Sequence, residues 1–331
     1  MKKIYLLAIC LAGVLLASCS SIRMFSYDQL MPSVVNYPES VRKVGIVNNL
    51  PARQRPANDK LTIGDVQADG KIAAEAFAEA VANANYFDET LISDSLINTG
   101  RGIGNVRTLS ASQVSNLAAS MGVDMLFSLD NFEVVTSRKV VMDWELGPVE
   151  VLSADVKPLV HVYLPGKEGP LYAVSKSDSL YFYLTRTLSD RSVVEGVSKN
   201  AVLPLVDYLL PHWRNAERCY FDGGSVEMRD AGVWAREGDW AEARNLWQKV
   251  FDNSGKNNRK KKMRAAFNIA LSYEMEGAPD KGVEWLKKAE KLNTTDVKDL
   301  EMLKWYKKEL TQRTDELNKL GVQMLRFNKN F

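Results

Sequence analysis

The residues best placed for chemistry are Leu16-Ala17-Ser18-Cys19, which follow two lysines, Lys2 and Lys3, and an apolar stretch over residues 4–16. About a dozen apolar residues is the length of a signal peptide and is too short for a membrane-spanning helix. Small residues directly before a cysteine are the cleavage pattern of a lipoprotein signal. The sequence therefore predicts that residues 1–18 are removed and that the thiol of Cys19 carries diacylglycerol.

Acylation of Cys19 would fix the protein to a membrane. One acyl chain such as palmitate gives only marginal binding, at about 0.8 kcal/mol per buried methylene, whereas two or more make the attachment lasting. The alternative is an ordinary secretory signal with an incidental cysteine. Surface lipoproteins of Bacteroides-type bacteria commonly carry acidic residues after the acylated cysteine, whereas Ser20-Ser21-Ile22-Arg23 follow here. We therefore expect the periplasmic face of the outer membrane, with the cell surface or the inner membrane as alternatives.

Composition is that of a folded protein behind the anchor. Residues 1–18 take two lysines and no acid from the 43 Lys and Arg and 41 Asp and Glu of the chain, so the mature protein has no net charge. A nucleic-acid-binding protein would normally show a basic excess, so no nucleic-acid partner is expected. The 331-residue chain exceeds one typical domain. Cys219 is left without a partner for a disulfide, and we expect it to be a small buried side chain.

A search for catalytic or ligand-binding groups returns little. His161 and His212 are the two histidines, and no cluster with cysteine or carboxylate has the spacing of a zinc site. Residues 100–104, Gly-Arg-Gly-Ile-Gly, lack the lysine of a phosphate-binding loop and the spacing of a dinucleotide fingerprint. No catalytic residue, metal site or cofactor is therefore predicted. The basic run Arg259 to Lys262 could meet lipid phosphates, although a solvated loop between helices is the more common use of such a run.

The residues after the anchor divide into three stretches. Residues 19–40 hold Pro32 and Pro38 and little periodicity, which predicts a tether. Residues 41–220 alternate short apolar runs with helical periodicity, which indicates an α/β domain. Residues 221–331 are predicted to form an all-helical domain, whose helices are joined by loops. The expected fold class is thus α+β/α in two domains.

The α/β domain is expected to begin with a buried strand at residues 44–47. Asp69 should cap a helix with an apolar stripe over residues 72–84, and residues 90–92 form a second strand. Ser110 and Gln113 have capping-box spacing, and Gly122 suits the end of that helix. A third, longer strand covers residues 125–135. Two hairpins should follow, turned by residues 166–169 and by the serine-rich residues 175–179, and then a helix over residues 191–217 divided at Pro204.

The helical domain carries an internal repeat. Gly238 and Gly277 mark corresponding positions of two copies that match the spacing of a tetratricopeptide repeat, with an insertion in the first copy. Aromatic residues at these offsets usually fill the space between helices, although they could line a groove for a partner. The aromatic residues with either role are Trp234, Trp240, Trp247, Tyr273 and Trp285. Ala243 and Ala270 should lie where helices cross. Two repeats alone leave apolar faces open, and a final helix from about Asp296 can cover one of them.

The order of strands and helices from residue 44 to the strand after Gly122 resembles the small periplasmic α/β domains of the curli-secretion lipoprotein and of the TolB N-terminal group. The whole chain resembles an uncharacterised Bacteroides-type lipoprotein family with tetratricopeptide-like ends. These resemblances imply organisation and no particular activity.

Two classes of function stay open on the sequence. The first is a membrane-anchored, non-enzymatic scaffold for protein interaction or envelope assembly, which binds an unknown envelope protein through its helical repeats. The second is a small-ligand receptor or enzyme with an unrecognised site in the α/β domain. We favour the scaffold, because no constellation of reactive residues is evident.

Overall fold

The structure is a computed structural model of the chain, and it describes residues 22–51, 61–93, 97, 108–255, 257–292 and 294–330, with residues 328–330 described by their backbone alone. The predicted signal peptide, Cys19 and the glycine-rich residues 100–104 lie outside these ranges. The chain divides into a sheet unit, residues 32–212 and 322–331, and a helical unit, which takes in residues 22–31 and 213–321. In the described ranges no helix is both long and apolar enough to cross a membrane.

The sheet unit is built on a mixed sheet whose described strands have the order β4-β2-β5-β6-β7, with β3 beside β5 and β8 beside β6. Strands β4, β2 and the first part of β5 are parallel, whereas β5 and β6 form an antiparallel hairpin. The strands are β2 (Lys43–Asn48), β3 (Gly64–Asp65), β4 (Glu89–Ile92), β5 (Met125–Asp143), β6 (Gly147–Tyr163), β7 (Tyr172–Ser175) and β8 (Asp178–Tyr183).

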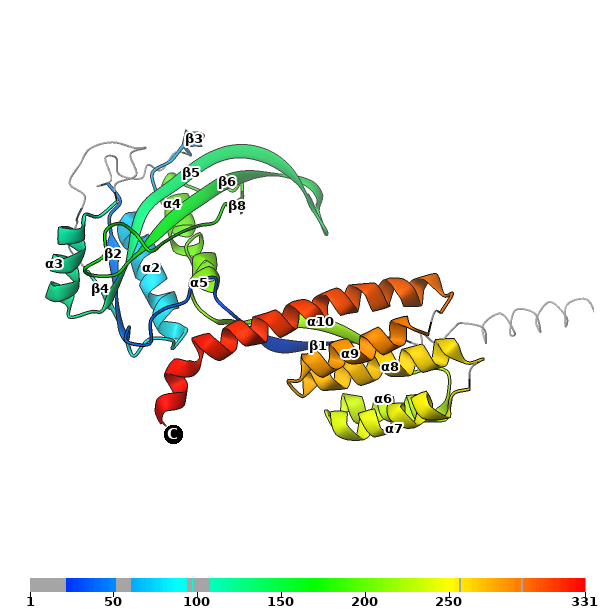
Figure 1. The fold of residues 1–331 in the computed structure, drawn as a ribbon. Helices are drawn as coiled ribbons and strands as arrows, with labels where there is room; N and C mark the ends of the chain where they lie inside the picture. The colour runs from blue at the N-terminus through cyan, green and yellow to red at the C-terminus, as the bar shows by residue number, and fades with distance from the viewer. Residues whose placement is uncertain are drawn as a thin grey trace, which may run out of the picture. The chain divides into compact units, whose positions relative to one another are not determined.

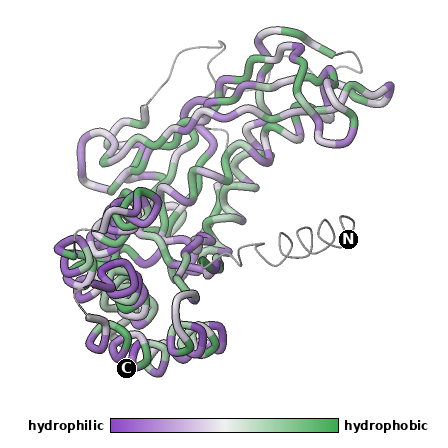
Figure 2. Tube along the Cα trace, turned by 90° about the vertical axis from the view of Figure 1, so that its right-hand side faces the viewer, coloured by the Kyte–Doolittle hydropathy of each residue, from purple (hydrophilic) through white to green (hydrophobic). Residues whose placement is uncertain are grey.

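The two faces of this sheet are covered unequally (Figure 1). Helices α2 (Gly70–Asn83), α4 (Asp190–Asn200) and α5 (Leu203–Leu209) bury the larger apolar core on one face, around Phe77, Phe127 and Leu205. Helix α3 (Ala111–Met121) packs on the other face, over the end of the sheet that holds the parallel strands. Apolar and polar residues alternate along the strands and helices (Figure 2), as expected of elements with one buried side.

Several sequence predictions for this unit are confirmed. Asp69 caps α2 through the backbone N–H groups of Lys71 and Ile72. Ser110 and Gln113 form the capping box of α3, and Gly122 ends that helix in the left-handed conformation with φ of 67°. The predicted strands at residues 44–47 and 90–92 are β2 and β4.

Three predictions are wrong in detail. The serine-rich residues 175–179 do not turn a hairpin, because β7 and β8 both pair with β6 along the same edge, at Leu159–Val162 and Val151–Val156 respectively. The turn of the main hairpin is at residues 144–146, beyond the predicted end of the third strand, because β5 continues past the polar residues 136–139 to Asp143. The helix expected over residues 191–217 ends at Leu209, and β9 (His212–Phe221) follows.

The helical unit contains α6 (Val226–Arg236), α7 (Trp240–Asn253), α8 (Arg259–Met275), α9 (Pro279–Glu290) and most of α10 (Val297–Gln323). Gly238 and Gly277 connect α6 to α7 and α8 to α9 at φ of 82° and 77°, in the left-handed region that favours glycine. These are the two helical hairpins that the repeat predicts. Residues 325–330, which follow α10, form a short 3₁₀ helix that belongs to the sheet unit.

The predicted tether is wrong for residues 22–31. These residues form β1 (Ile22–Met31), which pairs with β9 in a two-stranded sheet of the helical unit. Ile22 and Phe25 pack against the helical core, and the centroids of the Phe25 and Trp240 rings are 5.5 Å apart. The chain is therefore already part of a folded unit from Ile22. The domain boundary placed at 220/221 falls at the end of β9, whereas the compact units divide at 212/213.

Candidate functional site

A buried carboxylate, Asp130, lies where the parallel and antiparallel parts of the sheet meet. The register of β5 and β6 shifts between Leu129 and Asn131, so Asp130 is the extra residue of a bulge. Bulges re-aim side chains, and this one directs Asp130 towards polar groups on both strands. Crevices at the carboxyl ends of parallel strands are the usual ligand sites of open α/β sheets, and Asp130 lies just past the residues of β5 that pair with β2.

Four side chains donate hydrogen bonds to Asp130. Asn49 Nδ2 lies 2.9 Å from Oδ1, and the Ser128 hydroxyl binds the same oxygen. His161 Nδ1 lies 2.6 Å and the Tyr163 hydroxyl 3.0 Å from Oδ2. The Asp130 side chain is fully buried and that of His161 is 9% exposed. Burial, followed by the charge of Asp130, raises the pKa of Tyr163 above its ordinary value, which keeps its hydroxyl protonated as a donor.

This arrangement orients an imidazole. A carboxylate on Nδ1 holds the histidine tautomer in which Nε2 is free to accept a proton, as in hydrolytic triads. However, the Ser128 hydroxyl donates to Asp130 and not to His161, so these described residues do not form the nucleophile–base pair of a triad. The described residues also hold no group of three or more metal-ligating side chains. His161 is packed in the sheet unit, with a buried acidic partner.

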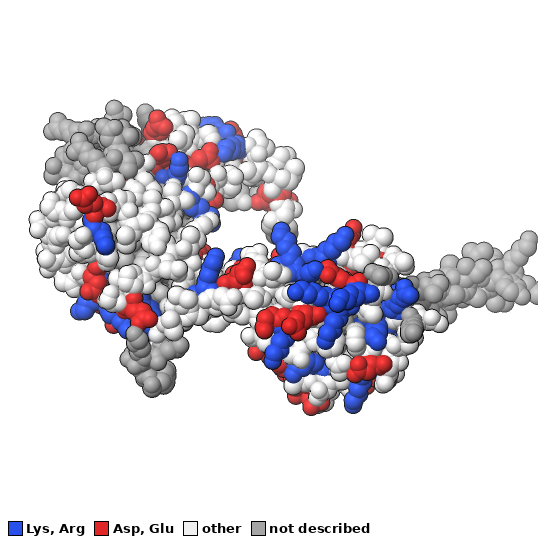
Figure 3. All heavy atoms as spheres, in the orientation of Figure 1, with Lys and Arg blue, Asp and Glu red and all other residues white. Residues whose placement is uncertain are grey.

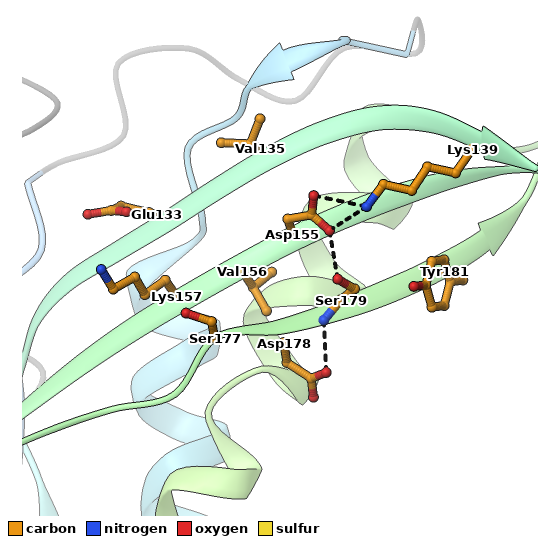
Figure 4. Close-up of a pocket in the computed structure, with 10 residues that line it drawn as sticks. All are labelled: Glu133, Val135, Lys139, Asp155, Val156, Lys157, Ser177, Asp178, Ser179 and Tyr181. Atoms are coloured by element: carbon orange, nitrogen blue, oxygen red, sulfur yellow. Dashed lines mark hydrogen bonds and ion pairs between the residues drawn. The ribbon is translucent and has the colours of Figure 1, made fainter.

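A shallow hollow of about 700 Å³ lies on the sheet face that carries His161. No described helix covers this part of the sheet (Figure 4). Lys139 Nζ lies 3.0 and 3.1 Å from the two carboxylate oxygens of Asp155. Hydrogen bonds from Ser179 and Lys139 lower the pKa of Asp155 below its usual value. Tyr181 borders the hollow and is 55% exposed. Opposite charges here neutralise one another, so the hollow has no strong preference for a cation or an anion.

The hairpin ends in an apolar tip. β8 pairs with β6 only as far as Val151, so the residues of β5 and β6 beyond this point form a two-stranded ribbon (Figure 1). Val140, Met142, Trp144 and Leu146 are 70, 79, 89 and 69% exposed. We call these four residues the ribbon tip. Sequence reasoning missed the ribbon tip, although Trp144 within a short apolar and acidic turn was a usable signal.

The predicted partner-binding aromatic residues are separated by the structure. Trp247 is fully buried in the core of the helical unit, and Trp240, Tyr273 and Trp285 are partly buried against that core. Trp234 is the one of the five that is markedly exposed, at 40%. Four of the five are thus core residues, which leaves Trp234 as a surface candidate. Cys19, the predicted lipid attachment site, lies outside the described residues.

A second buried carboxylate lies in the helical unit and was also missed. Arg218 of β9 binds Glu274 of α8 through Nε and Nη2, at 2.8 to 3.1 Å. The hydroxyls of Tyr306 and Tyr27 donate to the same carboxylate at 2.7 and 3.1 Å. Arg218 and Glu274 side chains are 5 and 2% exposed. This cluster joins β1, β9, α8 and α10, and it fixes the first described strand of the chain to the helices. Cys219, next to Arg218, is buried as predicted, and burial raises the pKa of its thiol to about 11.

The protein therefore consists of a mixed α/β sheet unit followed by an all-helical region. Residues 41–221, more than half of the chain, match a family described as a domain of unknown function, DUF8603, and the chain belongs to that family. Residues 229–312 match a second family described as a domain of unknown function, DUF6340.

Comparison with solved structures gives low similarities. The PelC dodecamer from Paraburkholderia phytofirmans is 10% identical, with a TM-score of 0.30 over 57% of this chain and 99% of that chain. A putative neuraminyllactose-binding hemagglutinin homolog from Helicobacter pylori is 7% identical, with a TM-score of 0.27 over 53% of this chain and 83% of that one. No curated protein matches. The predicted resemblance to curli-secretion and TolB domains stays a prediction.

Proposed function

We propose that this protein is a lipid-anchored envelope scaffold, held through Cys19 at the periplasmic face of the outer membrane, that binds a partner protein through the ribbon tip of its sheet unit. The anchor is supported by the lipoprotein signal at residues 16–19. The partner surface is supported by the exposure of four large apolar side chains at the end of one hairpin. The helical repeats, through Trp234, offer a second surface for the same or another envelope protein.

The observation that carries the proposal is the contrast along the β5–β6 hairpin. At its base, Leu126, Phe127 and Val162 are completely buried, whereas at its end Met142 and Trp144 are 79 and 89% exposed. Clustered large apolar side chains on a protein surface mark interaction sites. Tryptophan is also enriched among the residues that dominate binding at protein interfaces. The ribbon tip therefore has the composition of an interface without a covering element among the described residues.

The charges at the turn favour a protein over lipid as the occupant. Asp143 and Glu145 flank Trp144, and both would have to enter the bilayer with it. Hydrogen bonds from Tyr183 and from the backbone N–H groups of Leu146 and Glu145 lower the pKa of Asp143, so this carboxylate stays charged. Burial of an ionised carboxylate in hydrocarbon is costly. A protein with an apolar groove and basic residues at its rim would accept the tip without that cost.

The proposal is tested by comparing two exposed tryptophans. Trp144→Ser removes the centre of the ribbon tip, and Trp213→Ser removes a tryptophan of similar exposure, 70%, on β9. After crosslinking in intact cells, we expect the Trp144 variant to lose a crosslinked partner that the Trp213 variant retains, while both stay folded. Equal recovery of partners by the two variants would refute the ribbon tip as the interface. Loss of palmitate labelling in Cys19→Ala tests the anchor separately.

The alternative, a small-ligand receptor or enzyme, is favoured by one observation, the His161 imidazole held by Asp130. A ligand that binds Nε2 would depend on His161 and not on the ribbon tip. Binding or turnover of any small molecule that is lost in His161→Gln and retained in Trp144→Ser would establish this alternative.

A further inference from the structure

The beginning of α8 is electrostatically unusual. Arg259, Lys260, Lys261 and Lys262 are its first four residues, and its first turn contains no acidic residue. The N-terminus of a helix carries a partial positive charge, so cations there are unfavourable by themselves. This helix also has no side-chain hydrogen bond at its N-cap. The local sequence therefore works against the stability of the helix, and an external anion would offset the cost.

The starts of three helices lie together at this end of the helical unit. Lys260 binds Asp296, directly before α10, at 2.6 Å, and Arg264 binds Asp299 in the first turn of α10 at 2.8 Å. The guanidinium of Arg264, in the second turn of α8, lies over the Phe221 ring at 4.6 Å, and α6 begins five residues after Phe221. We call this end, the first turns of α6, α8 and α10, the basic end.

The composition of the basic end suits a lipid surface. Arg259 and Lys261 have no salt bridge to any residue that the structure describes, and Lys262 Nζ lies over the Phe251 ring. The first residues of α6 and α10, Val226 and Val297, are 57 and 66% exposed. Cations beside exposed apolar side chains are the pattern of proteins that rest at the headgroup layer of a membrane. Figure 3 shows many Lys and Arg side chains on the helical unit, with Asp and Glu among them.

The position of the anchor brings this end to the membrane. β1 begins at Ile22, and Arg23 Nε lies 2.6 Å from Asp222, which directly precedes the turn into α6. Cys19 is three peptide steps before Ile22, and whatever path the chain takes, three steps span at most about 11 Å. Electrostatic attraction to anionic lipids acts over about 8 Å at physiological ionic strength. The helical unit thus cannot move far from the bilayer once Cys19 is acylated.

We infer that the basic end of the helical unit rests on the anionic phosphate headgroups of the membrane that holds the anchor. This inference rests on the proposed acylation of Cys19. It gives the helical unit a fixed orientation, with the starts of α6, α8 and α10 towards the lipid. Arg259 and Lys261, which oppose the helix dipole of α8, then lie close to lipid phosphates, whereas Lys260 is already paired with Asp296.

The test uses the acylated, mature protein in two kinds of vesicle, phosphatidylcholine alone and phosphatidylcholine with phosphatidylglycerol. Flotation with the vesicles first shows that the anchor is present. Acetylation of individual lysines by a water-soluble ester is then followed by mass spectrometry. We expect Lys260, Lys261 and Lys262 to react roughly five-fold more slowly on the anionic vesicles, which is the factor expected for one cation near such a surface. Salt at 1 M should abolish this difference, because the screening length falls to about 3 Å.

Matched controls make the result specific. Lys308 lies about 16 Å along α10 from its first residue and should react equally on both vesicles. Lys261→Glu with Lys262→Glu should remove the protection of Lys260, whereas the same change at Lys304 and Lys308, which are both exposed, should retain it. Equal acetylation of Lys260 on neutral and anionic vesicles, in protein that floats with both, would overturn the inference and leave the anchor intact. Failure to float would instead overturn the anchor.

Discussion

Asp130 of the sheet unit and Glu274 of the helical unit are both buried carboxylates, and the two are neutralised differently. Glu274 is held by Arg218, a permanent cation, and by two tyrosine hydroxyls. Asp130 is held by hydrogen-bond donors of which only His161 can carry a charge. The buried Arg218–Glu274 ion pair ties β9 to α8. A carboxylate that binds an imidazole instead orients that ring, so the sheet unit is the place to look for chemistry and the helical unit for rigidity.

The largest expected effect is in the helical unit. Glu274→Gln leaves the buried Arg218 with the more distant Glu309, 3.9 Å from Nη1 and 34% exposed, as its acidic neighbour. Breaking a buried pair by removing one partner costs about 3–5 kcal/mol. The control is Glu276→Gln, which removes the partner of Arg244 in a pair whose side chains are 22 and 33% exposed. Exposed pairs contribute about 1 kcal/mol or less. Urea unfolding of the two variants measures both costs, and similar values would show that the Arg218–Glu274 pair is not a structural tie.

In the sheet unit we expect a smaller loss. Asp130→Asn weakens bonds from Asn49, Ser128, His161 and Tyr163 but leaves no permanent cation unpaired. Hydrogen bonds to charged groups contribute about 1.5–3 kcal/mol, so the free energy of unfolding should fall by an amount in that range. Urea unfolding that shows a loss as large as that of Glu274→Gln would remove the distinction between the two carboxylates.

A third change probes how closely the helical unit is packed. A methyl group at Gly282 of α9 would meet the backbone oxygen of Ala270 at 2.8 Å and Leu310 at 2.7 Å, whereas one at Gly321 of α10 would meet nothing within 4 Å. Gly282→Ala should therefore destabilise the protein by about 1–3 kcal/mol through overpacking. Gly321→Ala should stabilise it slightly through helix propensity. Thermal unfolding that shifts in the same direction in both variants would contradict this packing.

The smallest expected effect concerns Cys219. Its pKa is raised to about 11 from 9.0 by burial, so the unfolded chain releases the thiol proton at lower pH than the folded protein. Stability from this group is complete below pH 9 and is lost as the pH rises towards 11. Between pH 9 and pH 10 the free energy of unfolding should fall by roughly 1 kcal/mol. Cys219→Ala should show a shallower fall over the same interval. Identical pH profiles for the two proteins would show that the thiol is not buried as the structure has it.

The elements that sequence reasoning placed correctly carry local signals. Asp69, the Ser110 and Gln113 pair and the two turn glycines Gly238 and Gly277 each act on backbone groups within a few residues, so their spacing was informative. Ala243 and Ala270 are fully buried, as expected of residues between helices. The fold class could therefore be predicted from such signals, although several boundaries could not.

What was missed depends on contacts between distant parts of the chain. Residues 136–139 are polar or charged, and they stay in β5 because seventeen residues of β6 offer them an antiparallel partner. β1 is a strand because β9 pairs with it across nearly two hundred residues, as the separation of Arg23 and Asp222 shows. Asp130 and Glu274 look like any other carboxylates in the sequence. Their partners come from separate elements, and no spacing rule connects them.

The most direct test of the central claim, that the ribbon tip binds a partner protein in the envelope, is site-specific photocrosslinking in intact cells. A photoreactive side chain at position 144 is compared with one at position 213, both of which are exposed. The proposal expects a discrete crosslinked protein from position 144, absent from position 213 and abolished by Met142→Lys in the same chain. Crosslinks from position 144 to lipid alone, or the same products from both positions, would contradict it.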